Sequence, residues 1–202
     1  MDNIISQLIA AKSEEIRNLM VDFGKDMMYG KIVFNNRQIV ELGKTVNFRQ
    51  QNVVFVGWED GKISIMPYNP GIDNIISLPF SGCLMGTFTF RNWNYAVHIS
   101  TSEDPTKDRR VDWKNFCEYY PVMNIKIFQP NKCLKTEEKY NSVWGIISNT
   151  GNCYSAGIGR IDNIEDYRCF IIEQVVRTFN DALGYTNLYR GWQFYNNRIF
   201  EL

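Results

Sequence analysis

A cysteine and a histidine are the residues of this chain with the clearest potential for covalent chemistry. Cys83 follows Ser81 and Gly82 and opens an apolar run where a turn is expected to become a strand. His98 is the single histidine among 202 residues, and imidazole ordinarily titrates near neutral pH. A thiolate attacks a carbonyl carbon, and the N–H groups of a Ser-Gly turn can hold the resulting oxyanion. The residues therefore predict a Cys-His hydrolase in which an accessible thiolate pairs with an imidazolium.

The distance between the two side chains depends on how their strands pair. If residues 91–94 close a simple hairpin, His98 lies opposite Thr87. Cys83 then shares that face but lies four residues further along, roughly 13 Å from His98. A Cys-His contact in that case requires the turn to fold back over the sheet, a β-bulge or a different pairing. Alternation places the His98 ring on the face away from Val97, so the ring need not be buried.

The inventory of metal-binding and redox-active side chains excludes several other chemistries. One histidine excludes a multi-histidine metal site, and five cysteines without C-x-x-C spacing indicate neither a disulfide framework nor a zinc site. We expect reduced thiols, no metal and no organic cofactor. Four cysteines lack a preceding Ser-Gly turn and are interpreted as structural: Cys117, Cys133, Cys153 and Cys169.

The surrounding segments predict an α+β fold whose core is a mostly antiparallel sheet or sandwich with flanking helices. Apolar residues at three- and four-residue intervals predict one long amphipathic helix over residues 3–28. A short helix is expected over residues 109–120, which end before a proline. Three hairpins are predicted, pairing residues 53–58 with 62–66 around Asp60-Gly61, 83–90 with 95–101, and 143–149 with 153–161. Further strands are expected at residues 31–34, 125–128, 167–176 and 192–200, although 168–180 also fits a helical period.

The length indicates one globular domain over residues 1–202, which we expect to be a single catalytic domain. The chain is 45% hydrophobic and carries 22 basic and 22 acidic residues, so its formal net charge is zero. Without a basic stripe, direct binding of nucleic acid is not expected. Prolines and glycines interrupt the uncharged stretches, and the first residues lack a positively charged n-region, so we expect no membrane span and no signal peptide. We expect a monomer.

The segment from Ser77 to His98 resembles a family of bacterial toxins. A Ser-Gly-Cys turn, a histidine fifteen residues downstream and a β-rich chain of this length are similar to the catalytic domain of the cytotoxic necrotizing factors. The single-domain Burkholderia lethal factor type is more similar still in length. These toxins carry Leu-Ser-Gly-Cys, and this chain has Phe80 at the position of the leucine. The resemblance implies a protein glutamine deamidase that uses no cofactor.

The resemblance also implies a role for each residue of the site. Cys83 would attack the carboxamide carbon of a protein glutamine, while His98 would activate the thiol, protonate the departing ammonia and assist hydrolysis of the thioester. In the lethal-factor type a threonine hydroxyl six residues before the cysteine belongs to the site, and here that position is Ser77. The necrotizing factors use a backbone carbonyl instead, so both means of orienting His98 stay open. The main-chain N–H of Cys83, after Ser81 and Gly82, is the candidate oxyanion donor.

As a function, the resemblance implies an effector made in the bacterial cytoplasm that acts in the cytosol of a host cell. The lethal-factor branch acts on a translation-initiation RNA helicase and so blocks translation. The necrotizing-factor branch acts on Rho-family GTPases. We expect the helicase as the host partner, with the Rho-family GTPases as the alternative.

Two hypotheses of other classes remain. A papain-like hydrolase such as a peptidoglycan peptidase would place Cys83 at the start of a helix. A non-enzymatic binding module would bury Cys83 with no histidine nearby.

Overall fold

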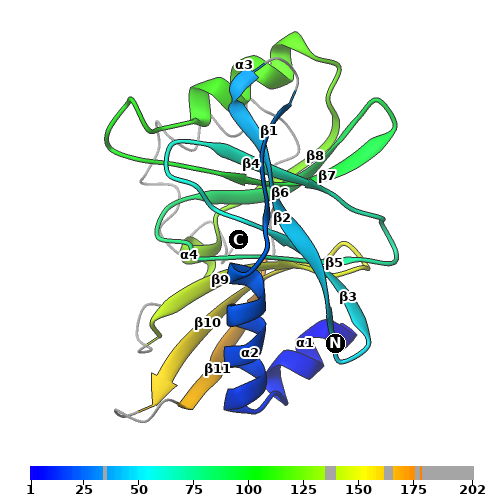
Figure 1. Cartoon of the computed structure of the whole chain (residues 1–202), viewed down its shortest axis with the longest axis vertical. Coiled ribbons are helices and arrows are strands. Elements are labelled where there is room, and N and C mark those ends of the chain that lie inside the picture. Colours follow the sequence, from blue (N-terminus) through cyan, green and yellow to red (C-terminus); the bar gives the residue numbers. More distant parts are fainter. Residues whose placement is uncertain (34–35, 135–139, 162–165, 176–177, 179–202) are drawn as a thin grey trace, which may run out of the picture.

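The computed structural model describes residues 1–33, 36–134, 140–161, 166–175 and 178. The strand expected at residues 192–200 lies outside this part of the chain. Within the described residues the fold is α+β (Figure 1). The helices are α1 (Asn3–Ile9), α2 (Ser13–Gly24), α3 (Arg110–Tyr119) and α4 (Pro130–Cys133). The strands are β1 (Met28–Val33), β2 (Asn36–Phe48), β3 (Gln51–Val56), β4 (Ile63–Pro67), β5 (Asn74–Ser77), β6 (Leu84–Phe90), β7 (Trp93–Ile99), β8 (Met123–Phe128), β9 (Ser142–Ile147), β10 (Cys153–Ile161) and β11 (Asp166–Gln174).

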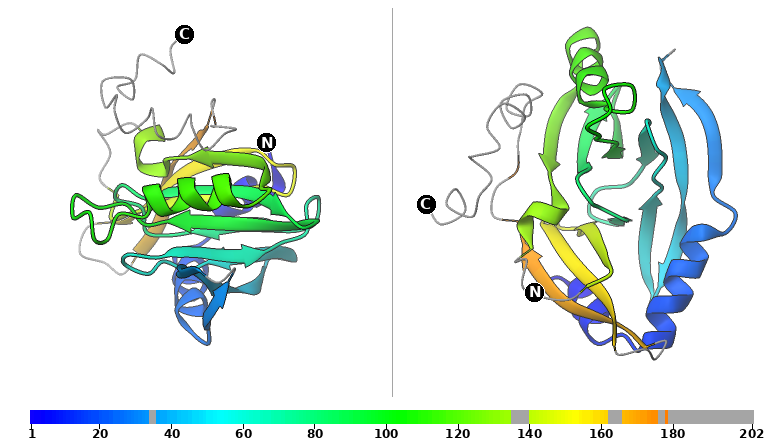
Figure 2. Two further views of the ribbon diagram at one scale, coloured as in Figure 1. Left: turned by 90° about the horizontal axis from the view of Figure 1, so that it is seen from above. Right: turned by 90° about the vertical axis from the view of Figure 1, so that its left-hand side faces the viewer.

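All the described strands belong to one curled sheet. Its order is β11-β10-β9-β5-β3-β2-β4-β7-β6-β8, and β1 pairs with β2 off this path. The pairs β2–β4 and β3–β5 are parallel, and the other described pairs are antiparallel. The expectation of a mostly antiparallel sheet is thus confirmed. Figures 1 and 2 show α3 across one end of this sheet and the helices α1 and α2 at the other end.

The alternation of side chains divides the core between the two faces of the sheet. On the outer face, α1 and α2 pack on β3, β5, β9 and β10, and α3 packs on β4, β6 and β7. The inner face closes on itself and forms a third apolar cluster. On β3, for example, Phe55 belongs to the outer cluster while Val54 and Val56 belong to the inner one. A polar side chain on the inner face is therefore enclosed by the sheet itself.

The single long helix expected over residues 3–28 is wrong, because the segment forms two helices. The chain leaves helical geometry between Ile9 and Ser13. Glu15 accepts the backbone N–H of Lys12 at 2.8 Å and so caps the start of α2. Arg49, from the turn between β2 and β3, donates to Glu15 and to the carbonyl oxygen of Ala10. A partner distant in sequence thus stabilises a break that the apolar period does not predict.

The hairpin expected around Asp60-Gly61 is also wrong in its pairing, although its strands and turn are present. Gly61 has φ +69°, as a tight turn allows for glycine. However, β3 pairs with β2 and β5, whereas β4 pairs with β2 and β7. The long strand β2 therefore lies between the two segments that the local turn signal joined.

The other two hairpins and the short helix are confirmed. Strands β6 and β7 pair antiparallel, as do β9 and β10, and α3 covers most of residues 109–120. Residues 125–128 lie in β8, and β11 settles residues 166–174 as a strand rather than a helix. The β6–β7 turn is tighter than expected, because Arg91 and Asn92, with φ of 48° and 66°, form a two-residue connection.

Candidate functional site

The inner face of the sheet carries three of the predicted site residues. Ser77 is the last residue of β5, His98 lies near the end of β7, and Cys83 immediately precedes β6. The exposed fractions are 0% for Ser77, 1% for His98 and 5% for Cys83. Each alternates with neighbours that pack on the outer face, so strand periodicity alone directs the three side chains into one enclosed space.

The register of β6 and β7 brings Cys83 closer to His98 than expected. Met85, rather than Thr87, pairs with His98, and the register shifts by two residues because the turn at Arg91 is tight. Cys83 precedes Met85 by two residues and so shares its face. By this register the positions of Cys83 and His98 are diagonal across the two strands, and positions so related are about 7–8 Å apart rather than roughly 13 Å.

A chain of hydrogen bonds fixes the orientation and tautomer of His98. The Ser77 hydroxyl donates to the carbonyl oxygen of Val56 at 2.6 Å, and its oxygen lies 2.8 Å from Nδ1 of His98. Because the hydroxyl has one hydrogen and donates it to the Val56 carbonyl oxygen, the Ser77 oxygen accepts a hydrogen bond from Nδ1–H of His98. Nε2 of His98 is then the unprotonated nitrogen. It is buried and has no hydrogen-bond partner in the described part of the chain.

Burial keeps the imidazole neutral. The Phe80 ring stacks on the His98 ring, with centroids 4.3 Å apart and planes 9° from parallel. Removal from water lowers the pKa of His98 to about 3, because the apolar surroundings disfavour the charged form. Contrary to the sequence-based expectation, the ring is therefore fully buried, and it is a neutral base rather than an imidazolium at neutral pH.

The Cys83 sulfur is enclosed as well, which contradicts the expected accessible thiolate. Burial raises the pKa of its thiol, and hydrogen bonds from Thr101 and from the Trp58 side chain oppose that effect. No hydrogen bond joins Sγ to Nε2 of His98, since that nitrogen has no partner among the described residues. In this conformation the site holds a neutral thiol beside a neutral imidazole instead of an ion pair.

Side chains from the segment that follows β8 hydrogen-bond to the Ser-Gly turn. Asn131 donates to the carbonyl oxygen of Ser81 at 2.8 Å, and Gln129 donates to that of Gly82 at 2.6 Å. In a trans peptide the N–H group points away from the carbonyl of the same unit. The N–H groups of Gly82 and Cys83 therefore point away from these two amides. A fixed turn of this kind can present donors to an oxyanion.

The other cysteines have surroundings of a different kind. Burial raises the pKa of Cys117 and Cys153 to about 12, and that of Cys133 to about 11. Sequence analysis missed Thr101 and Trp58 as neighbours of the Cys83 sulfur. They belong to no recognisable motif, and only the packing of two connecting segments brings them together.

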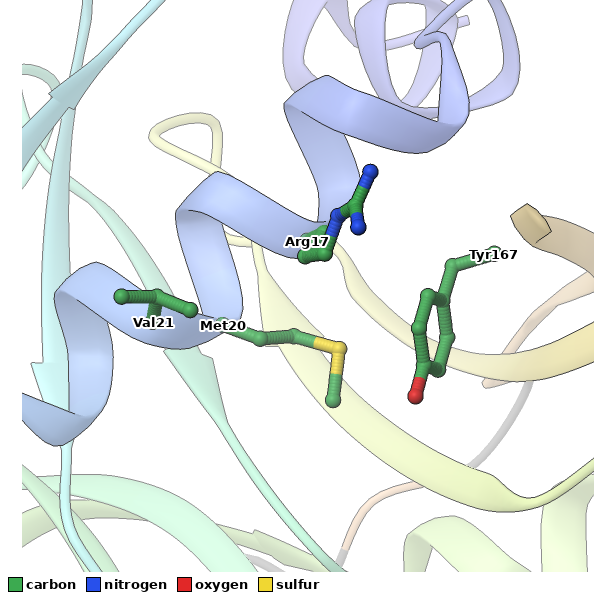
Figure 3. Close-up of a pocket in the computed structure, with 4 residues that line it drawn as sticks. All are labelled: Arg17, Met20, Val21 and Tyr167. Atoms are coloured by element: carbon green, nitrogen blue, oxygen red, sulfur yellow. The ribbon is translucent and has the colours of Figure 1, made fainter. Parts of the chain in front are cut away.

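A surface pocket lies elsewhere on the molecule. Its volume is about 240 Å³, and its walls are formed by Arg17, Met20 and Val21 of α2 and by Tyr167 of β11. Figure 3 shows Arg17 and Met20 projecting from the helix towards the Tyr167 ring. The pocket opens on the outer face of the sheet and contains none of the predicted site residues.

Comparison with known proteins places the chain in no family: no family model, no curated protein and no solved structure matches it. The described helices are all too short or too polar to cross a bilayer. In the same part of the chain, no three His, Cys, Asp or Glu side chains come together as metal ligands.

Proposed function

We propose that this protein is a protein glutamine deamidase that uses Cys83 as its nucleophile and His98 as its base. The observation that carries the proposal is the Val56–Ser77–His98 chain of hydrogen bonds. It holds the imidazole in the tautomer that a general base requires, with the free nitrogen buried on the face that carries the cysteine. A structural histidine in a core would ordinarily have both ring nitrogens satisfied.

The reaction follows from these positions. When the site opens, water reaches the imidazole and its pKa rises from the buried value towards its usual range. With the sulfur brought within hydrogen-bond reach, Nε2 of His98 takes the proton of the Cys83 thiol, and the sulfur attacks the carboxamide carbon of a glutamine side chain. The C=O electron pair moves to oxygen, where the N–H of Cys83 stabilises the charge. Collapse of the intermediate breaks the C–N bond, and the nitrogen leaves as ammonia with the proton from Nε2. Water, deprotonated by the same nitrogen, then cleaves the thioester and releases glutamate.

Entry of a substrate requires an opening of the site. Cys83 is 5% exposed and Nε2 of His98 is buried, so the described conformation is closed. Enzymes often close their sites in this way to exclude water and open them on binding. In the closed form no hydrogen bond joins the Cys83 sulfur to Nε2 of His98. The glutamine carboxamide would bind between these two groups.

The proposed setting is that of a bacterial effector in the host cytosol, and the proposed target is a translation-initiation RNA helicase. A Rho-family GTPase is the alternative target. Both assignments rest on the similarity of residues 77–98 to the deamidase toxins, and the hydroxyl residue six positions before the cysteine favours the helicase. The position of Ser77 against Nδ1 favours the lethal-factor type, which orients its histidine with a hydroxyl.

The papain-like alternative has no support from the position of Cys83. A helix N-terminus would lower the thiol pKa in such a hydrolase, but Cys83 precedes strand β6. A binding module without catalysis is the second candidate, and the burial of Cys83 at 5% exposure favours it. The deamidase and the binding module differ in the role of Cys83, which is the nucleophile in the first and a buried structural residue in the second.

A deamidation assay separates these candidates. Parent protein is incubated with a eukaryotic cytosolic extract, and peptides are searched by mass spectrometry for glutamine converted to glutamate. We expect conversion at a specific site by the parent, and none by Cys83→Ser or His98→Ala. Cys153→Ser is the matched control, because Cys153 is a buried thiol of the same apolar cluster. Equal peptide profiles for parent and Cys83→Ser would favour the binding module.

A further inference from the structure

A second buried polar side chain lies directly beside His98 on the inner face of the sheet. Ser64 of β4 pairs with His98 of β7 in the antiparallel register, so both side chains are on the same face. Ile63 and Ile65 belong to the outer cluster, which places the residue between them on the inner face. Ser64 is 1% exposed, as is His98. The enclosed space therefore contains a hydroxyl that the proposed reaction does not yet use.

The free polar atoms of these two side chains lack partners. Within the described residues, Oγ of Ser64 and Nε2 of His98 are both buried and make no hydrogen bond. Buried polar atoms are nearly always hydrogen-bonded, because an unpaired one destabilises the fold. Two such atoms on directly paired residues indicate a place where the polar group of a bound molecule is received.

The strand pairing brings the two side chains within reach of one small group. Directly opposed residues of an antiparallel pair have their Cβ atoms about 4.5–5.5 Å apart. A hydroxyl and an imidazole at such positions can contact the same nitrogen or oxygen atom of a ligand. Strand β7 lies between β4 and β6, so Ser64 is on one side of His98 and Cys83, which precedes β6, is on the other. A carboxamide with its carbon at the sulfur can thus direct its nitrogen towards Ser64.

The hydrogen-bonding capacity of the two atoms selects the kind of group that they hold. Nε2 of His98 is unprotonated and accepts one hydrogen, and the Ser64 hydroxyl can accept another. The nitrogen of a primary carboxamide carries two hydrogens, as does the oxygen of water. The nitrogen of a peptide bond carries one hydrogen and has a carbon in place of the other. The pair therefore favours a primary carboxamide over a peptide bond as substrate.

We propose that Ser64 is a catalytic residue of this protein, whose hydroxyl acts with Nε2 of His98 to bind first the nitrogen of the substrate carboxamide and then the hydrolytic water. The inference deepens the proposed function and rests on it. In the tetrahedral intermediate, Ser64 accepts one hydrogen of the nitrogen while Nε2 gives its proton to the lone pair of that nitrogen. The C–N bond then breaks and ammonia leaves.

Water then takes the place of the ammonia between the same two side chains. One of its hydrogens is accepted by Ser64, and Nε2 of His98 removes the other as a proton. The oxygen attacks the thioester carbon, the C–S bond breaks, and the proton on Nε2 returns to the Cys83 sulfur. Ser64 would thus act in both halves of the reaction.

Binding of a small carboxamide tests the inference without the natural substrate. Acetamide is titrated into ¹⁵N-labelled protein, and the Nε2 signal of the one histidine is followed. A ring nitrogen that accepts a hydrogen bond resonates upfield of a free one, so acetamide should move this signal upfield. N,N-dimethylacetamide keeps the carbonyl group but has no N–H, so it is the matched control ligand and should leave the signal in place. In Ser64→Ala the affinity for acetamide should fall about tenfold.

Substitution of Ser64 separates catalysis from folding. In the cytosolic extract, Ser64→Ala should convert glutamine about tenfold more slowly than the parent, while Ser64→Thr, which keeps the hydroxyl, should retain more of the rate. The urea midpoint of Ser64→Ala should equal or exceed that of the parent, because an unpaired buried hydroxyl is removed. Ser155→Ala is the matched control, since Ser155 is 0% exposed but lies on β10, which does not pair with β7.

The outcomes keep this inference apart from the proposed function. An Nε2 signal that acetamide leaves unmoved in the parent, or moves equally in Ser64→Ala, overturns the inference. Glutamine conversion at the parent rate by folded Ser64→Ala also overturns it and leaves the deamidase intact. Acetamide binding that depends on Ser64, without glutamine conversion by the parent, supports the carboxamide site and removes the deamidase. If Ser64→Ala unfolds, the comparison of the two amides on the parent decides the result.

Discussion

The protonation of His98 is determined by one hydroxyl proton. Since the Ser77 hydroxyl is committed to the Val56 carbonyl, its oxygen can only accept from the ring, and Nδ1 must carry the hydrogen. The state of the base is therefore a property of β3 and β5, two strands to which the histidine does not belong. This arrangement can be tested without knowledge of any substrate.

Nitrogen NMR gives a direct test of that tautomer. The chain contains one histidine, so a ¹⁵N-labelled sample shows a single imidazole. We predict a protonated Nδ1 and an unprotonated Nε2 at neutral pH. Ser77→Ala should remove the preference and lower the free energy of unfolding by about 1–3 kcal/mol, because buried Nδ1 loses its partner. A protonated Nε2 in the parent protein would contradict the hydrogen-bond assignment.

The buried imidazole also predicts a pH dependence of stability. In the unfolded chain His98 takes up a proton below about pH 6.5, whereas in the fold its pKa is lowered to about 3 by burial. The contribution to stability is thus complete above pH 6.5 and is lost as the pH falls towards 3, at about 1.4 kcal/mol per pH unit.

Urea denaturation between pH 7 and pH 4 measures this contribution. His98→Gln is the reference, because it removes the titrating ring and keeps the carboxylates whose protonation also lowers stability at acid pH. Glu15 is one of these carboxylates, since the hydrogen bond from Arg49 lowers its pKa to about 2. The stability of the parent should fall more steeply than that of the variant. Parallel curves would mean that the folded imidazole titrates normally.

Among the elements, the β6–β7 hairpin has the largest effect on the site. Its two-residue turn sets the pairing of Met85 with His98 and thereby the diagonal relation of His98 to Cys83. A four-residue loop would have moved the cysteine two residues further along its strand. The geometry of the site thus depends on the backbone at Arg91 and Asn92, where both φ angles are positive.

Substitution of Asn92 tests the turn. Asparagine tolerates positive φ better than alanine does, and glycine tolerates it best. We predict that Asn92→Ala lowers the free energy of unfolding by about 1 kcal/mol, while Asn92→Gly leaves it unchanged or raises it. Chemical denaturation of both variants provides the measurement. Equal destabilisation by alanine and glycine would show that the loss of the side chain, rather than the backbone conformation, is responsible.

At the scale of the whole molecule, the start of the chain is tied to the β9–β10 hairpin. The Asp2 carboxylate accepts hydrogen bonds from Thr150, Asn152 and Tyr154 at 3.0, 3.1 and 2.8 Å. Burial raises the pKa of Asp2, but the Ser148 side chain together with Tyr154, Asn152 and Thr150 outweighs it and leaves the pKa lowered. The contacts join residues about 150 positions apart and close the helical end of the fold.

Asp2→Asn should loosen this closure. The variant keeps the shape but removes the charge, so it should lower the free energy of unfolding by about 1 kcal/mol after allowance for partial exposure. Asp22→Asn, on the exposed side of α2, is the matched control and should have little effect. Thermal unfolding followed by tryptophan fluorescence gives the comparison. Equal melting temperatures for the two variants would argue against a stabilising role of the Asp2 hydrogen bonds.

The local patterns of the sequence predict most elements and the faces of their side chains. Alternation assigns His98 to the face away from Val97, and apolar spacing predicts α3 and the strands β6 to β10, because these signals depend on neighbours a few residues apart. The turn glycine at residue 61 is likewise predicted correctly. The sequence by itself also determines that one histidine and five cysteines are the groups available for acid–base and thiol chemistry.

The tertiary structure decided how these elements pair and which side chains they bury. The β2 strand separates β3 from β4, Arg49 stabilises a break between α1 and α2, and the curled sheet encloses the face that carries His98 and Cys83. The neutral imidazole and the buried thiol follow from that enclosure. Such features depend on residues far apart along the chain, whose meeting is governed by the burial of apolar surface over the whole sheet rather than by any local period.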